Sequence, residues 1–388
     1  MSGVTIEHQR RRLTVSQADV ATSVATLASA KVAEDLERAG LKELFASVEG
    51  KRAVCITGTT DQELTKKRSF TEKDSEVLVP EGQSAEENEQ WVRTLGLGWS
   101  CRKGMKPESP NQDSYSLLIV EGSFILIGVY DGHGAFGHDA SNIARRVVVR
   151  EFISHKLQGV DPGKALTDAF HTCQQELMTE KNRDFSTSGT TCTMAHLDLQ
   201  TDELTIAHVG DSRAVLARRP SPSSPYATED LSEDHKPNLE REKARIESAD
   251  PPGRVIFDGY YNHRVFAQGS ALPGLNMSRA LGDIIGNTEA GISATPDVRV
   301  VSLKEERAAS SGSSAATLLV CTDGVWEFIS SEQAFEYIAP HAKIGMQKCI
   351  DDLAKESWDA WMKDSDNEIS DDITAVCLCL ITPSEAAA

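Results

Sequence analysis

The sequence has no long uninterrupted apolar run and no leader-like segment at its start. A membrane-spanning helix needs about 18 consecutive apolar residues. Arg10, Arg11 and Arg12 are not followed by the apolar stretch of a secretion signal. Met1 is followed by Ser2 instead of the glycine that myristoylation requires. We therefore expect a protein without a membrane span that is not secreted and that resides in the cytoplasm, the nucleus or both.

Cysteines in metal-binding or redox spacing are also absent, because none of the eight cysteines forms a C-x-x-C pair. Several of them lie in apolar, strand-like runs, which is typical of buried free thiols in a reducing compartment. With 388 residues, 39% of them hydrophobic, the chain can form one large domain or two ordinary ones. Neither a disulfide nor a structural metal is needed to complete the core.

Positive charge is scarce, with 40 lysines and arginines against 59 aspartates and glutamates and a net charge of −19. Such a chain repels a nucleic-acid backbone unless a local basic face compensates, and the sequence shows no such face. Basic and aromatic residues do not alternate as they do in proteins that bind single strands. Nucleic acid is therefore not an expected partner, and a metal nuclease is disfavoured.

Residues 1–90 differ from the rest of the chain in being polar and low in aromatic residues. One helix is predicted from about residue 16 to 47, with Ser16 as a suitable N-cap. Residues 50–90, rich in Glu, Ser, Thr and Lys, have the composition of a polar linker. The basic residues 66–68 before Ser69 fit a nuclear address, a kinase site or, most simply, a solvated charge run. We divide the chain into an N-terminal extension, residues 1–90, and a main domain, residues 91–388.

The main domain mixes short strands with pairs of helices instead of alternating them strictly. Strands are predicted at 97–101, 116–120, 124–130, 190–199, 203–209, 213–218, 298–302, 317–322 and 373–381, and helices near 143–153, 165–177, 236–248, 331–338 and 345–362. The glycine-rich stretch 258–297 reads as a long irregular connection of the kind that is often functional. The fold class is therefore α+β, with a central β-sandwich of two antiparallel sheets and helices on both sides.

Two buried strands end directly in Asp-Gly. The apolar run 124–130 leads into Asp131 and His133, and the run 318–321 leads into Asp323. Further aspartates stand at predicted strand ends: Asp113, Asp211 and the pair Asp371-Asp372. Converging carboxylates raise one another's pKa unless a cation lies between them, so such a set indicates metal. Ligation by oxygen alone favours Mg²⁺ or Mn²⁺ over Zn²⁺.

Each of these residues also has a simpler interpretation when it is taken alone. Strand-end aspartates are commonly turn or cap residues, and His133 fits a turn histidine bonded to backbone. Taken together, however, His133 beside a metal carboxylate is a workable general acid. Two ions about 4 Å apart could share a hydroxide and direct it at phosphorus or carbonyl carbon. Hydrolysis of a phosphate ester follows, because the ions would also neutralise the charge of the substrate.

The order of the motifs adds a resemblance. They are Tyr130-Asp131-Gly132-His133-Gly134, Ser188-Gly189-Thr190-Thr191, Val209-Gly210-Asp211-Ser212-Arg213-Ala214, Asp234-His235-Lys236-Pro237, Ser278-Arg279-Ala280-Leu281-Gly282-Asp283, Thr322-Asp323-Gly324-Val325-Trp326-Glu327 and Asp371-Asp372-Ile373-Thr374. In this order they resemble the metal-dependent Ser/Thr protein phosphatases of type 2C, the PPM family, over roughly residues 91–382. The resemblance does not cover the first ninety residues.

The resemblance implies a pair of antiparallel sheets flanked by helical pairs, with two Mg²⁺ or Mn²⁺ ions at one edge. Carried over by position, Asp131 would bridge both ions and the Gly132 carbonyl would serve one of them. Asp323 and Asp371 would serve the other, and Asp113 would hold metal-bound water. A weaker third ion would involve Asp211, Asp323 and Glu327.

Other positions take supporting roles by the same resemblance. His133 matches the residue that protonates the leaving serine or threonine oxygen. Arg102 is the candidate for gripping phosphate, with Lys103 and Lys106 as alternatives. Gln112 stands where glutamate is frequent, and Asp372 stands where asparagine is frequent and is expected to support Asp371. A flap within residues 258–277 would select substrates, whereas 188–191 and 278–283 are interpreted as structural turns.

The function implied is that of a protein serine/threonine phosphatase whose substrates are phosphorylated proteins. Attack would come directly from a hydroxide that bridges the ions, because no cysteine stands in a phosphate-loop setting. We expect a monomer. The alternative is a pseudophosphatase, the same fold binding partners without turnover, against which the intact set Asp131, Asp323 and Asp371 argues.

Overall fold

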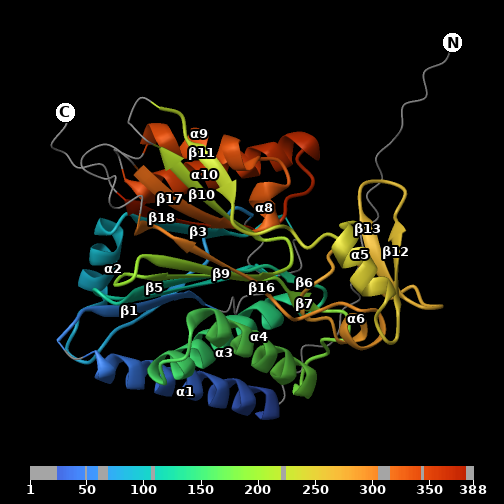
Figure 1. Cartoon of the computed structure of the whole chain (residues 1–388), viewed down its shortest axis with the longest axis horizontal. Helices are drawn as coiled ribbons and strands as arrows, with labels where there is room; N and C mark the ends of the chain where they lie inside the picture. The colour runs from blue at the N-terminus through green and yellow to red at the C-terminus, as the bar shows by residue number, and fades with distance from the viewer. Residues whose placement is uncertain are drawn as a thin grey trace.

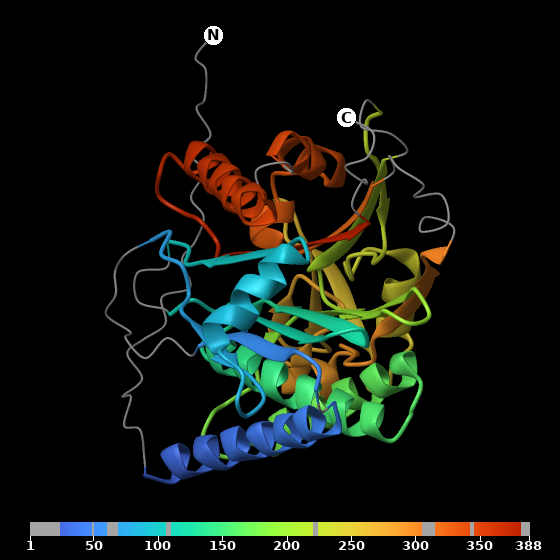
Figure 2. The ribbon, with the colours of Figure 1, turned by 90° about the vertical axis from the view of Figure 1, so that its left-hand side faces the viewer.

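The computed structural model describes residues 24–48, 50–59, 69–105, 110–219, 224–304, 315–341 and 345–381. In this part of the chain two antiparallel sheets stack face to face between two layers of helices (Figures 1 and 2). The predicted α+β sandwich is therefore confirmed.

The larger sheet has seven strands in the order β16-β9-β8-β5-β4-β1-β2. They are β1 (Ala53–Gly58), β2 (Ser75–Leu78), β4 (Ser114–Val120), β5 (Phe124–Tyr130), β8 (Cys192–Asp198), β9 (Glu203–Val209) and β16 (Asp297–Ser302). All seven residues of β4 and of β5 are buried, because this sheet is covered on both faces. Burial on both faces of the sheet explains why the run 124–130 is continuously apolar.

The smaller sheet has five strands in the order β11-β10-β17-β18-β3. They are β3 (Leu97–Arg102), β10 (Arg213–Arg219), β11 (Ala227–Asp230), β17 (Ala315–Cys321) and β18 (Ile373–Ile381). Side chains such as Ile127 from the larger sheet and Leu318 and Val376 from the smaller one meet in the core between the sheets. The predicted strands of the main domain are thus confirmed, within one or two residues at their ends.

Helices cover both outer faces of the sandwich (Figure 1). Against the larger sheet lie α1 (Val24–Ser47), α3 (Gly137–Leu157) and α4 (Pro162–Thr179). Against the smaller sheet lie α8 (Asp323–Trp326), α9 (Ser331–His341) and α10 (Met346–Asp364). The helix α2 (Ala85–Thr94) lies beside the edges of the sheets (Figure 2). No helix among the described residues has the length and hydrophobicity that a membrane crossing requires.

The helix α1 belongs to the predicted N-terminal extension and packs on α3. Its Leu41 and Leu44 are 2% exposed and join the core shared with that helix. Glu37 of α1 pairs with Arg145 of α3 at 3.5 Å, and both side chains are buried. The described helix begins at Val24, so the predicted N-cap Ser16 lies outside the described residues.

The predicted polar linker from 50 to 90 is wrong where the structure describes it. β1 is a fully buried strand of the larger sheet that pairs with β4, and β2 pairs with β1. The segment 69–78, here called the strap, runs beside both sheets. The amides of Phe70 and Lys73 donate to the carbonyls of Lys103 and Cys101, at 2.7 and 2.8 Å, before the chain enters β2. The prediction failed because the apolar run 53–56 is short and stands in polar sequence.

A small lobe projects from one end of the sandwich (Figure 1). It contains α5 (Glu240–Glu247), α6 (Ile284–Glu289) and a sheet of β12 (Gly253–Phe257), β13 (His263–Ala267) and β14 (Pro273–Leu275). The expectation that 258–297 is irregular was therefore wrong, because strands of three to five residues are too short to show alternation. A further sheet links β6 (Gly132–His133), β7 (Gly189–Thr190) and β15 (Leu281–Gly282).

Candidate active site

The strand-end aspartates gather at one end of the sandwich. In the larger sheet Tyr130, which precedes Asp131, pairs with Ser114, which follows Asp113. In the smaller sheet Cys321 lies between Arg213 and Ala375, so Asp323 is brought near Asp211 and near Asp371. Strand register thus delivers carboxylates from both sheets to the same end.

The aspartates of the larger sheet and those of the smaller sheet lie close enough to shift one another's pKa values. The pKa of Asp131 is raised well above its usual value by burial and then by the charges of Asp323, Asp113, Asp371 and Asp211. Burial, Asp211 and Asp371 likewise raise the pKa of Asp323 well above its usual value. These five carboxylates form the acidic cluster.

The acidic cluster has unused ligand atoms. Among the described residues, Oδ1 of Asp211 and Oδ1 of Asp323 are buried without a hydrogen-bond partner. In the same part of the chain, no three His, Cys, Asp or Glu side chains have the spacing that would enclose one metal ion. Mg²⁺ usually takes one or two carboxylates and keeps several waters. The cluster therefore fits hydrated divalent ions by its charge and its free oxygens.

Asp113 is held in place by two buried threonines. Its Oδ2 accepts hydrogen bonds from the hydroxyls of Thr322 and Thr374 at 2.9 and 2.7 Å. Burial and the neighbouring charge of Asp372 raise the pKa of Asp113 to about 7. Two hydrogen bonds thus fix the orientation of the side chain, while burial and the charge of Asp372 disfavour its ionised form.

Asp372 and Gln112 organise the loops around the cluster. The two carboxylate oxygens of Asp372 accept the backbone amides of Gly104 and Gln112 at 2.6 and 2.7 Å. The side-chain amide of Gln112 donates to the carbonyl of Gly134 at 2.7 Å. A Cβ on Gly132 would lie 2.2 Å from the carbonyl oxygen of Gly137, so only glycine fits there.

Lys236 is the cation that the structure places on the acidic cluster, and sequence reasoning gave it no role. Its Nζ donates to Oδ2 of Asp211 at 2.5 Å. Burial alone would raise the pKa of Asp211, but the charge and hydrogen bond of Lys236 lower it below the usual value. The only available signal was the motif Asp234-His235-Lys236-Pro237, which carries a lysine near neighbouring carboxylates.

His133 faces a carboxylate that sequence reasoning had interpreted as structural. Its Nε2 lies 2.6 Å from Oδ2 of Asp283, whose side chain is 1% exposed. The His133 side chain keeps 22% of its surface exposed, so the ring reaches solvent at the mouth of the site. His133 sits on β6, directly after the acidic cluster's Asp131.

The candidates for gripping phosphate lie in different settings. Arg102 pairs with Glu72 at 2.6 Å and with Asp351 at 3.3 Å, and its guanidinium lies 5.0 Å from the ring centroid of Phe70. Within the described residues none of these partners belongs to the predicted site. Lys103 is buried, and Lys106 lies outside the described residues. Glu327 is exposed and directly follows α8. Its backbone amide donates to the carbonyl of Asp323 at 2.8 Å.

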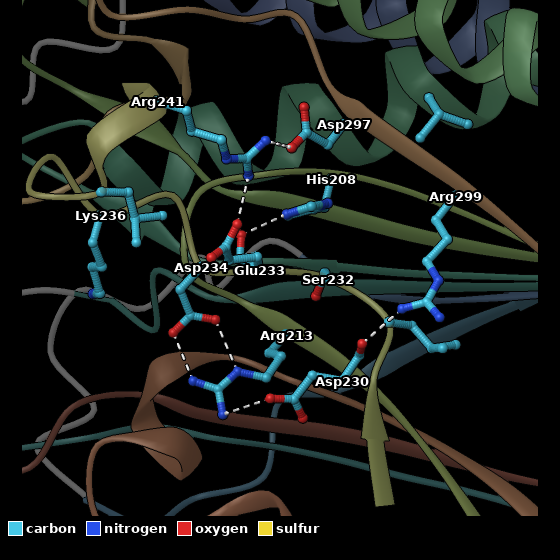
Figure 3. Close-up of a pocket in the computed structure, with 13 residues that line it drawn as sticks. His208, Arg213, Asp230, Ser232, Glu233, Asp234, Lys236, Arg241, Asp297 and Arg299 are labelled. Atoms are coloured by element: carbon cyan, nitrogen blue, oxygen red, sulfur yellow. Dashed lines mark hydrogen bonds and ion pairs between the residues drawn. The ribbon is translucent and has the colours of Figure 1, made fainter. Parts of the chain in front are cut away.

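A charged cavity of about 790 Å³ lies beside the site and shares Lys236 with it. Figure 3 shows that acidic and basic side chains face one another across it in pairs. Arg213 holds Asp234 through two hydrogen bonds of 2.8 and 2.7 Å, and Arg241 pairs with Asp297 at 2.6 Å. Since its cations already have carboxylate partners, this cavity has matched charge, unlike the acidic cluster.

Comparisons with known proteins agree with these features. Residues 109–366 match the family model described as Protein phosphatase 2C. The Arabidopsis thaliana protein named "Probable protein phosphatase 2C 34" is 31% identical over 300 residues, covering 71% of this chain and 78% of that protein. "Probable protein phosphatase 2C 48" of Oryza sativa subsp. japonica is 30% identical over 332 residues, covering 75% and 88%.

Solved structures show the same fold. The crystal structure of serine-threonine phosphatase 2C from Toxoplasma gondii superposes with a TM-score of 0.59 at 22% identity, covering 73% of this chain and 94% of that one. A sex-determining protein of C. elegans gives 0.59 at 19% identity, with coverages of 75% and 66%. At these identities the likeness concerns the fold alone.

Proposed function

The chain belongs to the protein phosphatase 2C family, and on this premise we propose that it is a metal-dependent phosphatase of phosphoserine and phosphothreonine in proteins. The observation that carries the proposal is the acidic cluster, in which burial and neighbouring charges raise the pKa of Asp131 and Asp323. Among the described residues, Oδ1 of Asp211 and Oδ1 of Asp323 are buried there without a hydrogen-bond partner. A bound divalent cation would relieve such repulsion, and a phosphate ester is a substrate that needs the same cation.

Two Mg²⁺ or Mn²⁺ ions would be held by the side chains of Asp131, Asp323 and Asp371 and the carbonyl of Gly132, with Asp113 holding water. When bound, the ions would acidify water for attack on phosphorus and offset the charge of the phosphate. A third ion at Asp211 and Glu327 would share Asp211 with Lys236, whose ammonium already neutralises part of that charge.

The chain's own residues complete the site. His133 would donate a proton to the leaving oxygen of serine or threonine. Its Nε2 lies 2.6 Å from Oδ2 of the buried Asp283. The hydroxyls of Thr322 and Thr374 hold Asp113, which would orient metal-bound water. For the phosphate itself we retain Arg102 as a proposal, which requires it to leave Glu72 or to act while paired. Lys236 is held against the cluster by its hydrogen bond to Asp211.

The experiment is hydrolysis of a phosphothreonine peptide by the full chain with Mn²⁺. We expect phosphate release that ceases on chelation and is absent in Asp131→Ala. Asp359→Asn is the matched control, because this carboxylate lies on the exposed face of α10 and pairs only with Lys355 among the described residues. Turnover that survives chelation contradicts metal dependence. Binding of Mn²⁺ without any turnover of phosphopeptides indicates the pseudophosphatase instead.

A further inference from the structure

Lys73 of the strap is 6% exposed, and its Nζ donates hydrogen bonds to the backbone carbonyls of Asp113 and, at 3.4 Å, of Asn111. Lysine is seldom buried to this extent. We propose that Lys73 is a positioning residue: its ammonium holds the backbone of residues 111–113, and with it Asp113, in the conformation that the acidic cluster needs to bind divalent ions. This inference rests on the proposed function and goes beyond it, because the strap lies before the stretch that matches the family model.

The backbone of the strap is pinned at the edge of the smaller sheet. The amide of Lys73 donates to the carbonyl of Cys101 at 2.8 Å, and Glu72 forms an antiparallel bridge with Arg102, the last residue of β3. The carboxylate of Glu72 also accepts the amide of Cys101 at 2.7 Å. Further along the strap, β2 pairs with β1 of the larger sheet. The strap is therefore fixed on both sides of Lys73, which gives this side chain a defined place.

A glycine leaves room for the stem of this lysine. A Cβ on Gly58, at the end of β1, would lie 3.2 Å from Cδ of Lys73 and 3.1 Å from the ring of Tyr115, which is tighter than most real contacts. The stem of Lys73 therefore packs against β1, while its ammonium reaches residues 111–113 just before β4 begins.

The hydrogen bonds of residues 111–113 leave the lysine a specific task. The amide of Gln112 donates to Asp372 at 2.7 Å, and the amide of Asp113 donates to Oδ1 of Asn111 at 2.9 Å. The carbonyls of Asn111 and Asp113 accept from Lys73, and a buried carbonyl without a donor is unfavourable. Without the lysine, we expect these carbonyls to turn toward other donors and to move Asp113 with them.

The charge and the hydrogen bonds of Lys73 act on metal binding in opposite directions. An ammonium beside the acidic cluster repels a cation, so removing the charge alone would strengthen the binding of divalent ions. Removing the donor would let Asp113 shift from the position in which Thr322 and Thr374 hold it, which would weaken binding. A role in stability alone would leave the affinity of the folded protein unchanged. The sign of the change in affinity therefore separates the three effects.

The first test measures Mn²⁺ binding to the full chain by isothermal titration calorimetry. Lys73→Met keeps most of the side-chain volume and removes the donor, and we expect its dissociation constant for Mn²⁺ to rise at least tenfold. Ser75→Ala is the matched control in the strap, because it removes the hydroxyl that bonds Tyr115 at 2.7 Å and leaves both bonds of Lys73 in place. Its affinity should stay within twofold of wild type. Unchanged or tighter binding in Lys73→Met would overturn the proposal.

A second measurement uses the wild-type chain, in case Lys73→Met does not fold. Mg²⁺ should slow amide hydrogen exchange at Lys73 at least fivefold, together with exchange at Gln112 and Asp113, because the strap and residues 111–113 open as one unit. Constant exchange at Lys73 while Gln112 and Asp113 slow would contradict the coupling. An equal slowing throughout α9 would mean general stabilisation and would count against it too.

Failure of the proposed function can be told apart from failure of this inference. Should the wild-type chain bind neither Mn²⁺ nor Mg²⁺, the proposed function fails, and hydrogen exchange in the metal-free chains still tests Lys73. The amide of Asp113 should then exchange at least fivefold faster in Lys73→Met than in wild type. Equal rates in the two chains would contradict the positioning role.

Discussion

Two groups of buried and partly buried carboxylates lie in the same chain and differ in their counter-charges. In the small lobe, Glu242 of α5 accepts hydrogen bonds from Arg279 at 2.6 Å and from Arg245 at 2.7 Å. Burial alone would raise the pKa of Glu242, but these guanidiniums lower it to about 2. The pKa of Asp297 is lowered by its hydrogen bond with His235 at 3.3 Å and by Arg241 and Arg279, at 2.6 and 2.7 Å.

The acidic cluster has the opposite character. Lys236 pairs with Asp211, and two threonine hydroxyls donate to Asp113, but the charges of neighbouring carboxylates act on the cluster, and the pKa values of Asp131, Asp323 and Asp113 are raised. Arg279 holds Glu242 by a bidentate pair of hydrogen bonds, and arginines thus make the first group structural. We infer that the counter-charge of the second group is a bound metal ion that can dissociate.

The largest contrast should come from removing one charge from the acidic cluster. Asp323→Asn should lower phosphatase activity about a thousandfold or more, because metal catalysis supplies several kcal/mol. The metal-free protein should be no less stable than wild type, since the change relieves repulsion. Steady-state kinetics and thermal unfolding in chelator measure the two effects. If Asp323→Asn had normal phosphatase kinetics and unfolded at a lower temperature than wild type, the distinction between the two groups of carboxylates would be wrong.

The same change in the other group should act on stability. Glu242→Gln leaves Arg279 and Arg245 without their shared carboxylate, and breaking a buried ion pair costs about 3 kcal/mol. Urea unfolding of the metal-free chain measures this loss. Lys355→Ala is the control, because its ion pair with Asp359 on α10 is more than half exposed and its loss should cost under about 1 kcal/mol. If Glu242→Gln and Lys355→Ala lowered the free energy of unfolding equally, the structural role assigned to Glu242 would be contradicted.

Divalent ions should stabilise the protein through the acidic cluster alone. At Mn²⁺ concentrations about a hundred times the dissociation constant, mass action adds about 2.7 kcal/mol to the free energy of unfolding. Glu242→Gln should keep this increment, and Asp323→Asn should lose most of it. Calorimetric scans with and without Mn²⁺ report the difference. An increment that survives in Asp323→Asn would place the ion elsewhere.

The pH dependence should differ in sign between the groups. The pKa of Asp113 is about 7 in the folded protein and near 4 in an unfolded chain, so folding takes up a proton between these values. Its contribution is fully present below pH 4 and is lost as pH rises toward 7, by at most about 1.4 kcal/mol per pH unit. Glu242 contributes above its unfolded pKa and loses that contribution as pH falls toward 2. Between pH 5 and 7, the free energy of unfolding of the metal-free protein should therefore fall less steeply with rising pH in Asp113→Asn than in wild type.

The strand-end aspartates could be located from sequence because their signal is local. An apolar run followed by Asp-Gly marks the C-terminal end of a buried strand, and in an antiparallel sheet that end lies beside the start of the neighbouring strand. This reasoning placed Asp131 and Asp323 at one end of the sandwich before any contact was known. The resemblance to the family then supplied the roles, which the structure leaves as proposals.

The partners of these aspartates could not be predicted because they depend on register between distant short strands. Asp283 reaches His133 across β6, β7 and β15, each only two residues long, so none shows a pattern in sequence. Lys236 follows no periodic element, and its contact with Asp211 is set by the loop before α5. The strand β1 was missed for a related reason, since its apolar character is confined to a few residues.

The strands β1, β2 and β3 limit how far this chain can be shortened. The stretch that matches the family model starts at residue 109, after β1, β2 and β3. A chain cut there would leave β4 and β18 as bare sheet edges, and all seven residues of β4 are apolar or otherwise buried in the intact fold. Exposed edges of this kind pair with those of other molecules. We therefore expect that β1, β2 and β3 protect the protein from aggregation and that a fragment defined by family resemblance alone precipitates.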